Sequence, residues 1–96
     1  MPKTSITVQQ ALGLRVRELR AAHGLTQEEF AERCGMFRTY MSRVESGKAN
    51  PTLTMLYVLA DALSVTVQML LEWPTVTDVP KVRSKERLAR GRVTRS

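Results

Sequence analysis

The chain has 96 residues, 43% of them hydrophobic, which suits one small domain with a modest core. Its single cysteine excludes an intramolecular disulfide framework and a zinc site made of several thiolates, and the lone His23 has no partner at metal-ligand spacing. No run approaches the roughly 20 apolar residues of a membrane span, and the start of the chain lacks the basic-then-apolar layout of a secretory signal. We therefore expect a cytoplasmic, metal-free protein.

The net charge of +6 lies at the C-terminal end of the chain. From Val79 onward there are seven basic residues and one acidic residue, whereas residues 1–78 contain eight of each sign. We expect a flexible arm over 1–7, a globular domain over 8–73 and a basic, disordered tail over 74–96. Such a tail is attracted to polyanions, nucleic acid first among them, although many tails are basic only for solubility.

The hydrophobic periodicity is helical throughout, and no stretch of four or more residues alternates strictly as a half-buried strand does. The fold class is therefore expected to be all-α. Thr7 and Gln10 have capping-box spacing at the start of a first helix over about 8–22. Gly24, just beyond its end, suits a left-handed position.

Two short helices are predicted next. The first of them begins after Thr26, which has capping-box spacing to Glu29, and is ended by Gly35. The second spans about 37–46, and three of its residues are expected to point inward: Phe37, Met41 and Val44.

The segment "SGKANPT" is a loop by composition. After it, Thr52 can cap the helix "LTMLYVLADAL", and Thr66 can cap a short last helix, "VQMLLEW", before Pro74. Five helices thus fit into about 70 residues.

The two short helices match the restricted positions of a helix-turn-helix counted from Gln27. Ala31 falls where two helix backbones approach closely, and Gly35 falls where the turn favours a positive φ. The positions that must be apolar are occupied by Phe30, Cys34, Met36, Met41 and Val44. In such a pair the second helix lies in the major groove of DNA. Its outward residues are Arg38, Thr39, Ser42 and Arg43.

Over about residues 8–73 the sequence resembles the Cro and C1-type repressor family, the xenobiotic-response-element-like helix-turn-helix regulators. It carries R-x-x-x-G-L-T-Q-E-x-F-A, then S-x-x-E-x-G, then N-P-T-L-x-x-L. Within that family, "RTYMS" followed by E-x-G-x-x-N is similar to the controller proteins of restriction-modification systems. The resemblance implies a five-helix lambda-repressor-like domain in a homodimeric transcriptional regulator that binds double-stranded DNA without a cofactor.

The resemblance also assigns residues that face the bases. Arg38, Thr39 and Arg43 match the base-reading positions, where arginine suits the O6 and N7 atoms of guanine and the threonine methyl suits the methyl of thymine. Tyr40 and Ser42 match polar positions at which controller-like members contact DNA.

Other residues match backbone-contacting positions, which fix the register on DNA without reading its sequence. Gln27 matches a glutamine that anchors a phosphate and braces the recognition helix, with Thr26 capping beside it. Lys48 and Asn50, in the loop after the recognition helix, match further phosphate-contacting positions.

Arg20 and Glu45 match a structural ion pair that links the recognition helix to the first helix, again by resemblance. Two residues depart from the family pattern. Phe37 stands where a small capping residue is usual, so the start of that helix must be held by other means. Ser64 replaces the glycine common between the last two helices, which affects the local turn.

The leading hypothesis is a sequence-specific regulator that acts as a homodimer on a pseudo-palindromic operator. The dimer is expected to use the last two helices and Trp73, with the fourth helix, through Tyr57 and Met55, as the second choice. Both aromatic residues could instead complete the core. An alternative is an antitoxin-type module whose tail, 74–96, binds a protein partner, although the tail has few apolar residues.

An enzyme is disfavoured because the sequence offers no paired carboxylates, no glycine-rich phosphate loop and no nucleophile with its base. Cys34 has no histidine at motif spacing and occupies a core position.

Overall fold

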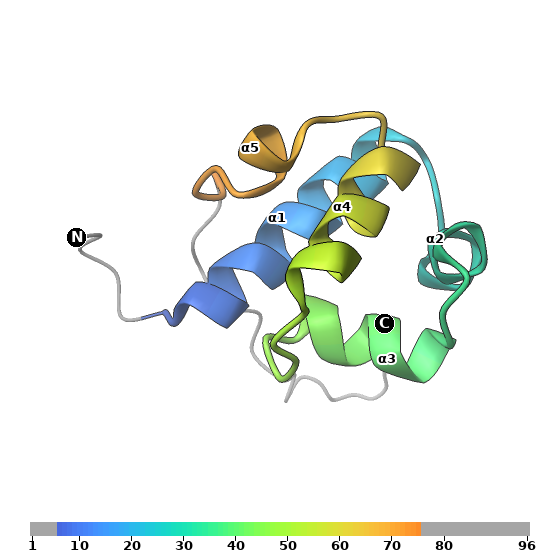
Figure 1. Ribbon diagram of the computed structural model, residues 1–96, viewed down its shortest axis with the longest axis horizontal. Helices are drawn as coiled ribbons and strands as arrows, with labels where there is room; N and C mark the ends of the chain where they lie inside the picture. The colour runs from blue at the N-terminus through green and yellow to red at the C-terminus, as the bar shows by residue number, and fades with distance from the viewer. Residues whose placement is uncertain (1–5, 76–96) are drawn as a thin grey trace, which may run out of the picture.

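The computed structural model describes residues 6–75, which form five α-helices and no strand (Figure 1). The helices are α1 (Val8–Ala22), α2 (Gln27–Cys34), α3 (Arg38–Glu45), α4 (Leu53–Ala62) and α5 (Val67–Leu70). The predicted all-α, five-helix fold is confirmed. Most of the predicted N-terminal arm and nearly all of the predicted basic tail lie outside the described residues. None of the helices in residues 6–75 has the length and hydrophobicity of a membrane-spanning segment.

Four of the five helices begin after a threonine whose hydroxyl accepts a hydrogen bond from the backbone N–H three residues later, at 3.0 to 3.2 Å. The four caps are Thr7, Thr26, Thr52 and Thr66. Such a cap stabilises a helix by about 1 kcal/mol, because it satisfies a backbone donor that has no partner within the helix. The capping signals in the sequence therefore located these four helix starts correctly.

The start of α3 differs from the other four. Phe37 is its N-cap and makes no capping hydrogen bond. The prediction that Phe37 points inward is wrong, because its side chain is 85% exposed. As an N-cap it has extended backbone angles, φ −72° and ψ 146°, and so it does not continue the helical stripe of Met41 and Val44. Those two residues are buried as predicted.

The core is formed by side chains from all five helices and their ends. The largest fully buried side chains are Val16, Phe30, Met41, Val44, Leu59, Leu63 and Leu70. Full burial of a side chain of this size contributes about 1.5–3 kcal/mol, so this cluster is the main source of stability. In Figure 1, α4 and α1 lie one behind the other, with α3 across one end and α5 near the other.

A close approach joins α1 to the end of α3. A Cβ atom added to Gly13 would overlap the backbone carbonyl oxygens of Val44 and Glu45, so only glycine allows the two helices to come this near. The prediction of a left-handed residue after α1 is also confirmed, since Gly24 has φ 69°.

The turn between α4 and α5 contains Ser64, which is the one non-glycine residue among 6–75 with a positive φ, at 57°. An L-residue in this region costs roughly 1–2 kcal/mol, which explains why glycine is the usual residue there.

Polar contacts hold the last part of the domain against α1. Arg15 donates a hydrogen bond to the carbonyl oxygen of Met69 at 2.9 Å and pairs with Glu72 at 3.2 Å. The backbone N–H of Thr75 donates to the carboxylate of Glu18 at 2.8 Å. These contacts tie α5 and the segment after it to α1.

Candidate nucleic-acid interface

The helix-turn-helix is formed by α2, the turn at Gly35 and α3. Gly35 has φ 68°, as the turn requires, and its N–H bonds to carbonyl oxygens at the end of α2. Ala31 is 2% exposed, and its small side chain suits a position where α2 packs against α3. The positive φ predicted at Gly35 is confirmed, and Ala31 is buried. The tight turn orients α3 so that its buried side faces the core and its other side faces solvent.

Four of the predicted DNA-contacting residues of α3 lie exposed on this outer side: Arg38, Thr39, Ser42 and Arg43. Their spacing of one and four residues places them on one face of a helix. Tyr40, the fifth, is partly buried and packs against the core. The structure therefore collects arginine, hydroxyl and phenol groups along one helix, which are the groups that bind base edges and phosphates.

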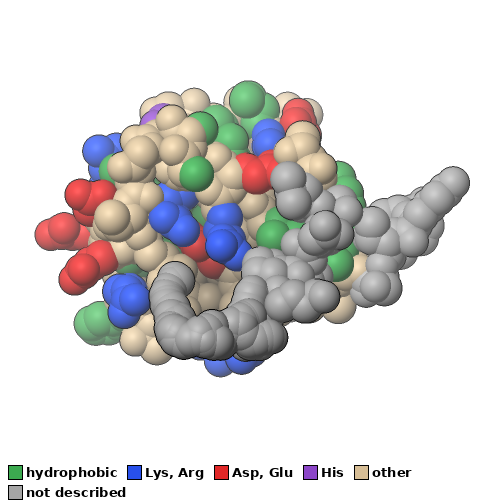
Figure 2. All heavy atoms as spheres, turned by 180° about the vertical axis from the view of Figure 1, so that it is seen from behind, with side chains coloured by type: hydrophobic (Ala, Val, Ile, Leu, Met, Phe, Trp, Pro, Cys, Tyr) green, Lys and Arg blue, Asp and Glu red, His purple; other side chains and the backbone are tan. Residues whose placement is uncertain are grey.

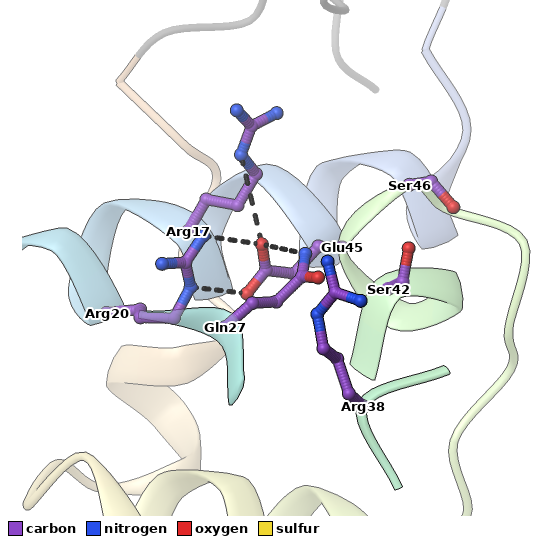
Figure 3. Close-up of a pocket in the computed structure, with 7 residues that line it drawn as sticks. All are labelled: Arg17, Arg20, Gln27, Arg38, Ser42, Glu45 and Ser46. Carbon is purple, nitrogen blue, oxygen red and sulfur yellow. Dashed lines mark hydrogen bonds and ion pairs between the residues drawn. The ribbon is translucent and has the colours of Figure 1, made fainter. Parts of the chain in front are cut away.

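The C-terminal end of α3 is fixed by the buried carboxylate of Glu45. Glu45 is 5% exposed, and Arg20 of α1 binds it through two hydrogen bonds, Nε to Oε2 at 2.6 Å and Nη2 to Oε1 at 2.8 Å. Gln27, the first residue of α2, donates to Oε1 at 3.1 Å. Figure 3 shows these side chains converging on Glu45 from α1 and α2. A buried carboxylate needs this number of partners, and here they lock three helices together.

Arg17 is a member of the site that the sequence did not reveal. Its Nε atom lies 3.9 Å from Oε1 of Glu45, and 45% of its side chain is exposed. It lines an open pocket together with Arg20, Gln27, Arg38, Ser42, Glu45 and Ser46 (Figure 3). Three arginines against one carboxylate make this pocket electropositive. The available signal was the spacing of Arg17 and Arg20, since residues three apart share a helix face.

Residues 6–75 contain seven basic and seven acidic residues, so any positive surface must arise from their arrangement. In Figure 2, basic side chains lie near the middle of the visible face with some acidic side chains beside them, and a further group of acidic side chains lies at the left edge. At the pocket, where three arginines surround one carboxylate, the local field attracts a polyanion although the domain is neutral overall.

The loop after α3 carries the two remaining predicted contacts. Lys48 and Asn50 are exposed, and Nη2 of Arg43 donates a hydrogen bond to the carbonyl oxygen of Lys48 at 3.0 Å. This bond places the Arg43 guanidinium beside the loop, whereas Arg38 lies at the other end of α3. The two arginines are therefore separated along the helix.

At the start of α2, Thr26 and Glu29 form a reciprocal capping box. The backbone N–H of Thr26 donates to the Glu29 carboxylate at 2.8 Å, and this bond, followed by the side-chain bond with Thr26, lowers the pKa of Glu29. Thr26 thus orients the helix end from which Gln27 projects.

Cys34 is half-buried, and burial raises the pKa of its thiol from the ordinary 9.0 to about 11. The thiol therefore stays protonated at neutral pH, which disfavours a nucleophilic role. Among residues 6–75, no three side chains of His, Cys, Asp or Glu come together to hold a metal ion.

The fold and this surface define a helix-turn-helix DNA-binding domain. A family model described as a helix-turn-helix domain matches residues 11–73. The chain belongs to this family, as a DNA-binding transcriptional regulator of the Cro/C1 type.

Comparison with individual proteins supports the resemblance to controller proteins. The chain is 41% identical over 64 residues to the control protein C.SmaI of Serratia marcescens, covering 67% of this chain and 76% of that protein. The crystal structure of the restriction-modification controller protein C.AhdI from Aeromonas hydrophila matches with a TM-score of 0.63 and 40% identity, over 65% of this chain and 94% of that one. SinR, a master regulator for biofilm formation crystallised in complex with DNA, matches with a TM-score of 0.60 and 31% identity, over 64% of this chain and 98% of that one.

Proposed function

We propose that this protein regulates transcription by binding a pseudo-palindromic operator as a homodimer. The observation that carries the proposal is the outer side of α3, where arginine and hydroxyl side chains are exposed while the inner side is locked to α1 and α2 through Glu45. A rigid helix with a polar outer face is suited to the major groove. The similarity to SinR, whose complex with DNA has been crystallised, supports this role.

Within this role, the residues divide into readers and anchors. Arg38, Thr39 and Arg43 are proposed to read bases, with Tyr40 and Ser42 contributing further contacts from the same helix. The anchors bind phosphates from neighbouring elements: Arg17, Thr26, Gln27, Lys48 and Asn50. Arg17 joins this set because it lies beside Gln27 and Arg38 in the same electropositive pocket.

A dimer is proposed because one recognition helix buries too little surface for useful specificity. The surface around α5 offers exposed apolar side chains for the contact: Met69 is 42% exposed, Leu71 52% and Trp73 36%. Tyr57 is 60% exposed and therefore does not complete the core. The surface of α4 around it is the second choice of interface. A two-fold dimer sets its recognition helices about 34 Å apart, which spaces the half-sites roughly 10 bp apart.

The basic tail, most of which lies outside the described residues, is proposed to add affinity that does not depend on sequence. Its net positive charge would release counterions from DNA phosphates. Removing residues 79–96 should therefore weaken binding to specific and random DNA alike and reduce the salt dependence of both.

The test is selection of binding sites from random duplex DNA by the purified full chain, followed by sedimentation of the protein with and without the selected DNA. We expect a site with dyad symmetry, half-sites roughly 10 bp apart and a dimer on the DNA. A selected site without dyad symmetry, or a monomer in both states, would contradict the dimeric mode. Failure to select any sequence would contradict base reading.

A further inference from the structure

Phe37 is the most exposed large apolar side chain among residues 6–75, at 85%. It directly precedes Arg38, the first residue of the recognition helix α3. No core residue covers the ring, and it is absent from the partly buried side chains that pack against the core. The free domain thus leaves a phenylalanine in water at the beginning of the helix that would meet DNA.

In the free domain, the Phe37 side chain neither caps α3 nor packs on the core. As an N-cap, phenylalanine offers no oxygen to the backbone N–H groups of α3, whereas the other four helices have a threonine at the equivalent position. A residue that violates a local rule without structural compensation is expected at functional sites.

Position and chemistry together identify what the ring would contact. A helix-turn-helix places the first residues of its recognition helix against base edges in the major groove. The base edges there present hydrogen-bond donors and acceptors, and the one apolar group they expose is the C5-methyl of thymine. On the outer face after Phe37, Arg38 suits the polar groups of a base and Thr39 offers one small methyl group. The Phe37 ring is the larger apolar surface available to a thymine methyl at this end of α3.

We propose that Phe37 contacts the C5-methyl group of a thymine beside the base read by Arg38, and that it thereby determines specificity at one position of each half-site. This inference rests on the proposed function. A wedge between base steps is the alternative for an exposed phenylalanine, but such wedges enter from the minor groove. A protein-binding patch would need several adjacent apolar side chains. The chain neighbours of Phe37 are Met36, which is partly buried, and Arg38, which is charged.

The experiment compares the full chain with Phe37→Ser, in two stages. First, sites are selected from random DNA with each protein. Wild type is expected to favour thymine at one position per half-site, and the variant to lose that preference while keeping the others. Second, each thymine of the wild-type site is replaced singly by deoxyuridine, which removes only the methyl group. Wild-type affinity should fall about four-fold at that thymine, as for one buried methyl group, and the variant's affinity should not change there.

Three control variants and one stability measurement make the result interpretable. Leu53→Ser changes another apolar residue, 68% exposed at the start of α4, and should retain the full response to deoxyuridine. Phe37→Leu keeps an apolar contact and should retain part of it. Thr39→Ala, which alters the other candidate for a thymine methyl, should affect a different thymine. Thermal unfolding of Phe37→Ser should show a domain at least as stable as wild type, which excludes misfolding as the cause of a lost preference.

The outcomes separate this inference from the function on which it rests. If deoxyuridine lowers the affinity of wild type and Phe37→Ser equally at every position, or lowers neither, the Phe37 contact is overturned while sequence-specific binding stands. If no sequence is selected by wild type, the proposed function is overturned, and the Phe37 contact with it.

Discussion

The two ends of α3 differ in burial and in the contacts that hold them. At its C-terminal end Glu45 is 5% exposed and is bound by Arg20, by Gln27 and, more distantly, by Arg17. At its N-terminal end Phe37 is 85% exposed and forms no capping bond. The C-terminal end is bound by α1 and α2, whereas at the N-terminal end Phe37 forms no capping bond and does not pack on the core.

This difference indicates how a small domain combines rigidity with recognition. A helix eight residues long is not stable in isolation, so its orientation must come from tertiary contacts. The polar contacts of this kind are concentrated at Glu45, at the C-terminal end of α3. The residues at the N-terminal end of α3 are not constrained by such contacts. Substitutions there should therefore alter sequence specificity more than stability.

The largest effect on stability is expected at the C-terminal end of α3. Glu45→Ala should lower the free energy of unfolding by about 3–5 kcal/mol, because it leaves the largely buried guanidinium of Arg20 without its carboxylate. Denaturant titration would measure this loss, with Glu32→Ala on the exposed side of α2 as the matched control, expected within about 0.5 kcal/mol of wild type. Equal stability of the two variants would contradict the view that Glu45 secures α3.

Gly13→Ala tests the same end from the side of α1. Alanine favours a helix over glycine by about 1 kcal/mol, so in open space the change would stabilise the domain. Here the added Cβ would overlap carbonyl oxygens of Val44 and Glu45, and backbone atoms cannot move aside as a flexible side chain can. We expect a net loss of about 1–3 kcal/mol in the free energy of unfolding. A gain in stability would show that α1 and α3 are not closely packed at this point.

Sequence reasoning succeeded where the signal is local. Thr7, Thr26, Thr52 and Thr66 were located as helix starts because a cap and its partner lie within one turn of each other. The buried positions of the helix-turn-helix followed from the spacing of the motif counted from Gln27, as for Phe30. Contacts between helices carry no such local signal, and the pairing of Arg20 with Glu45 was suggested by family resemblance instead.

Two residues show the limits of that reasoning in physical terms. Helical periodicity predicts that Phe37 points inward because it treats every residue of a segment as helical, whereas an N-cap has extended backbone angles and directs its side chain elsewhere. Arg17 was missed because its place beside Gln27 and Arg38 depends on how α1 packs against the other two helices. Both residues lie at or beside the proposed interface.

The proposed readers and anchors should respond differently to substitution. Arg38→Ala should weaken binding to the preferred operator by about 1–3 kcal/mol and relax base preference at one position of each half-site. Lys48→Ala should weaken binding to all sequences by similar factors and reduce the salt slope by about one unit. Binding to a panel of single-base operator variants measures both effects. An even loss for Arg38→Ala across the whole panel would make α3 a phosphate-binding helix and would remove the distinction between its two ends.

The smallest effect on stability is expected at the N-terminal end of α3. The direction of the change in the free energy of unfolding is the informative result there. Phe37→Thr should raise the free energy of unfolding by about 1 kcal/mol, because the threonine hydroxyl would accept a hydrogen bond from a backbone N–H of α3, as Thr26 does for α2. Denaturant titration of Phe37→Thr and Phe37→Ala separates the two contributions: threonine should stabilise the domain relative to alanine, since only threonine can cap. If threonine and alanine gave equal stability, the start of α3 would already be satisfied by other groups, and the contrast between the two ends of the helix would reduce to the exposure of one aromatic ring.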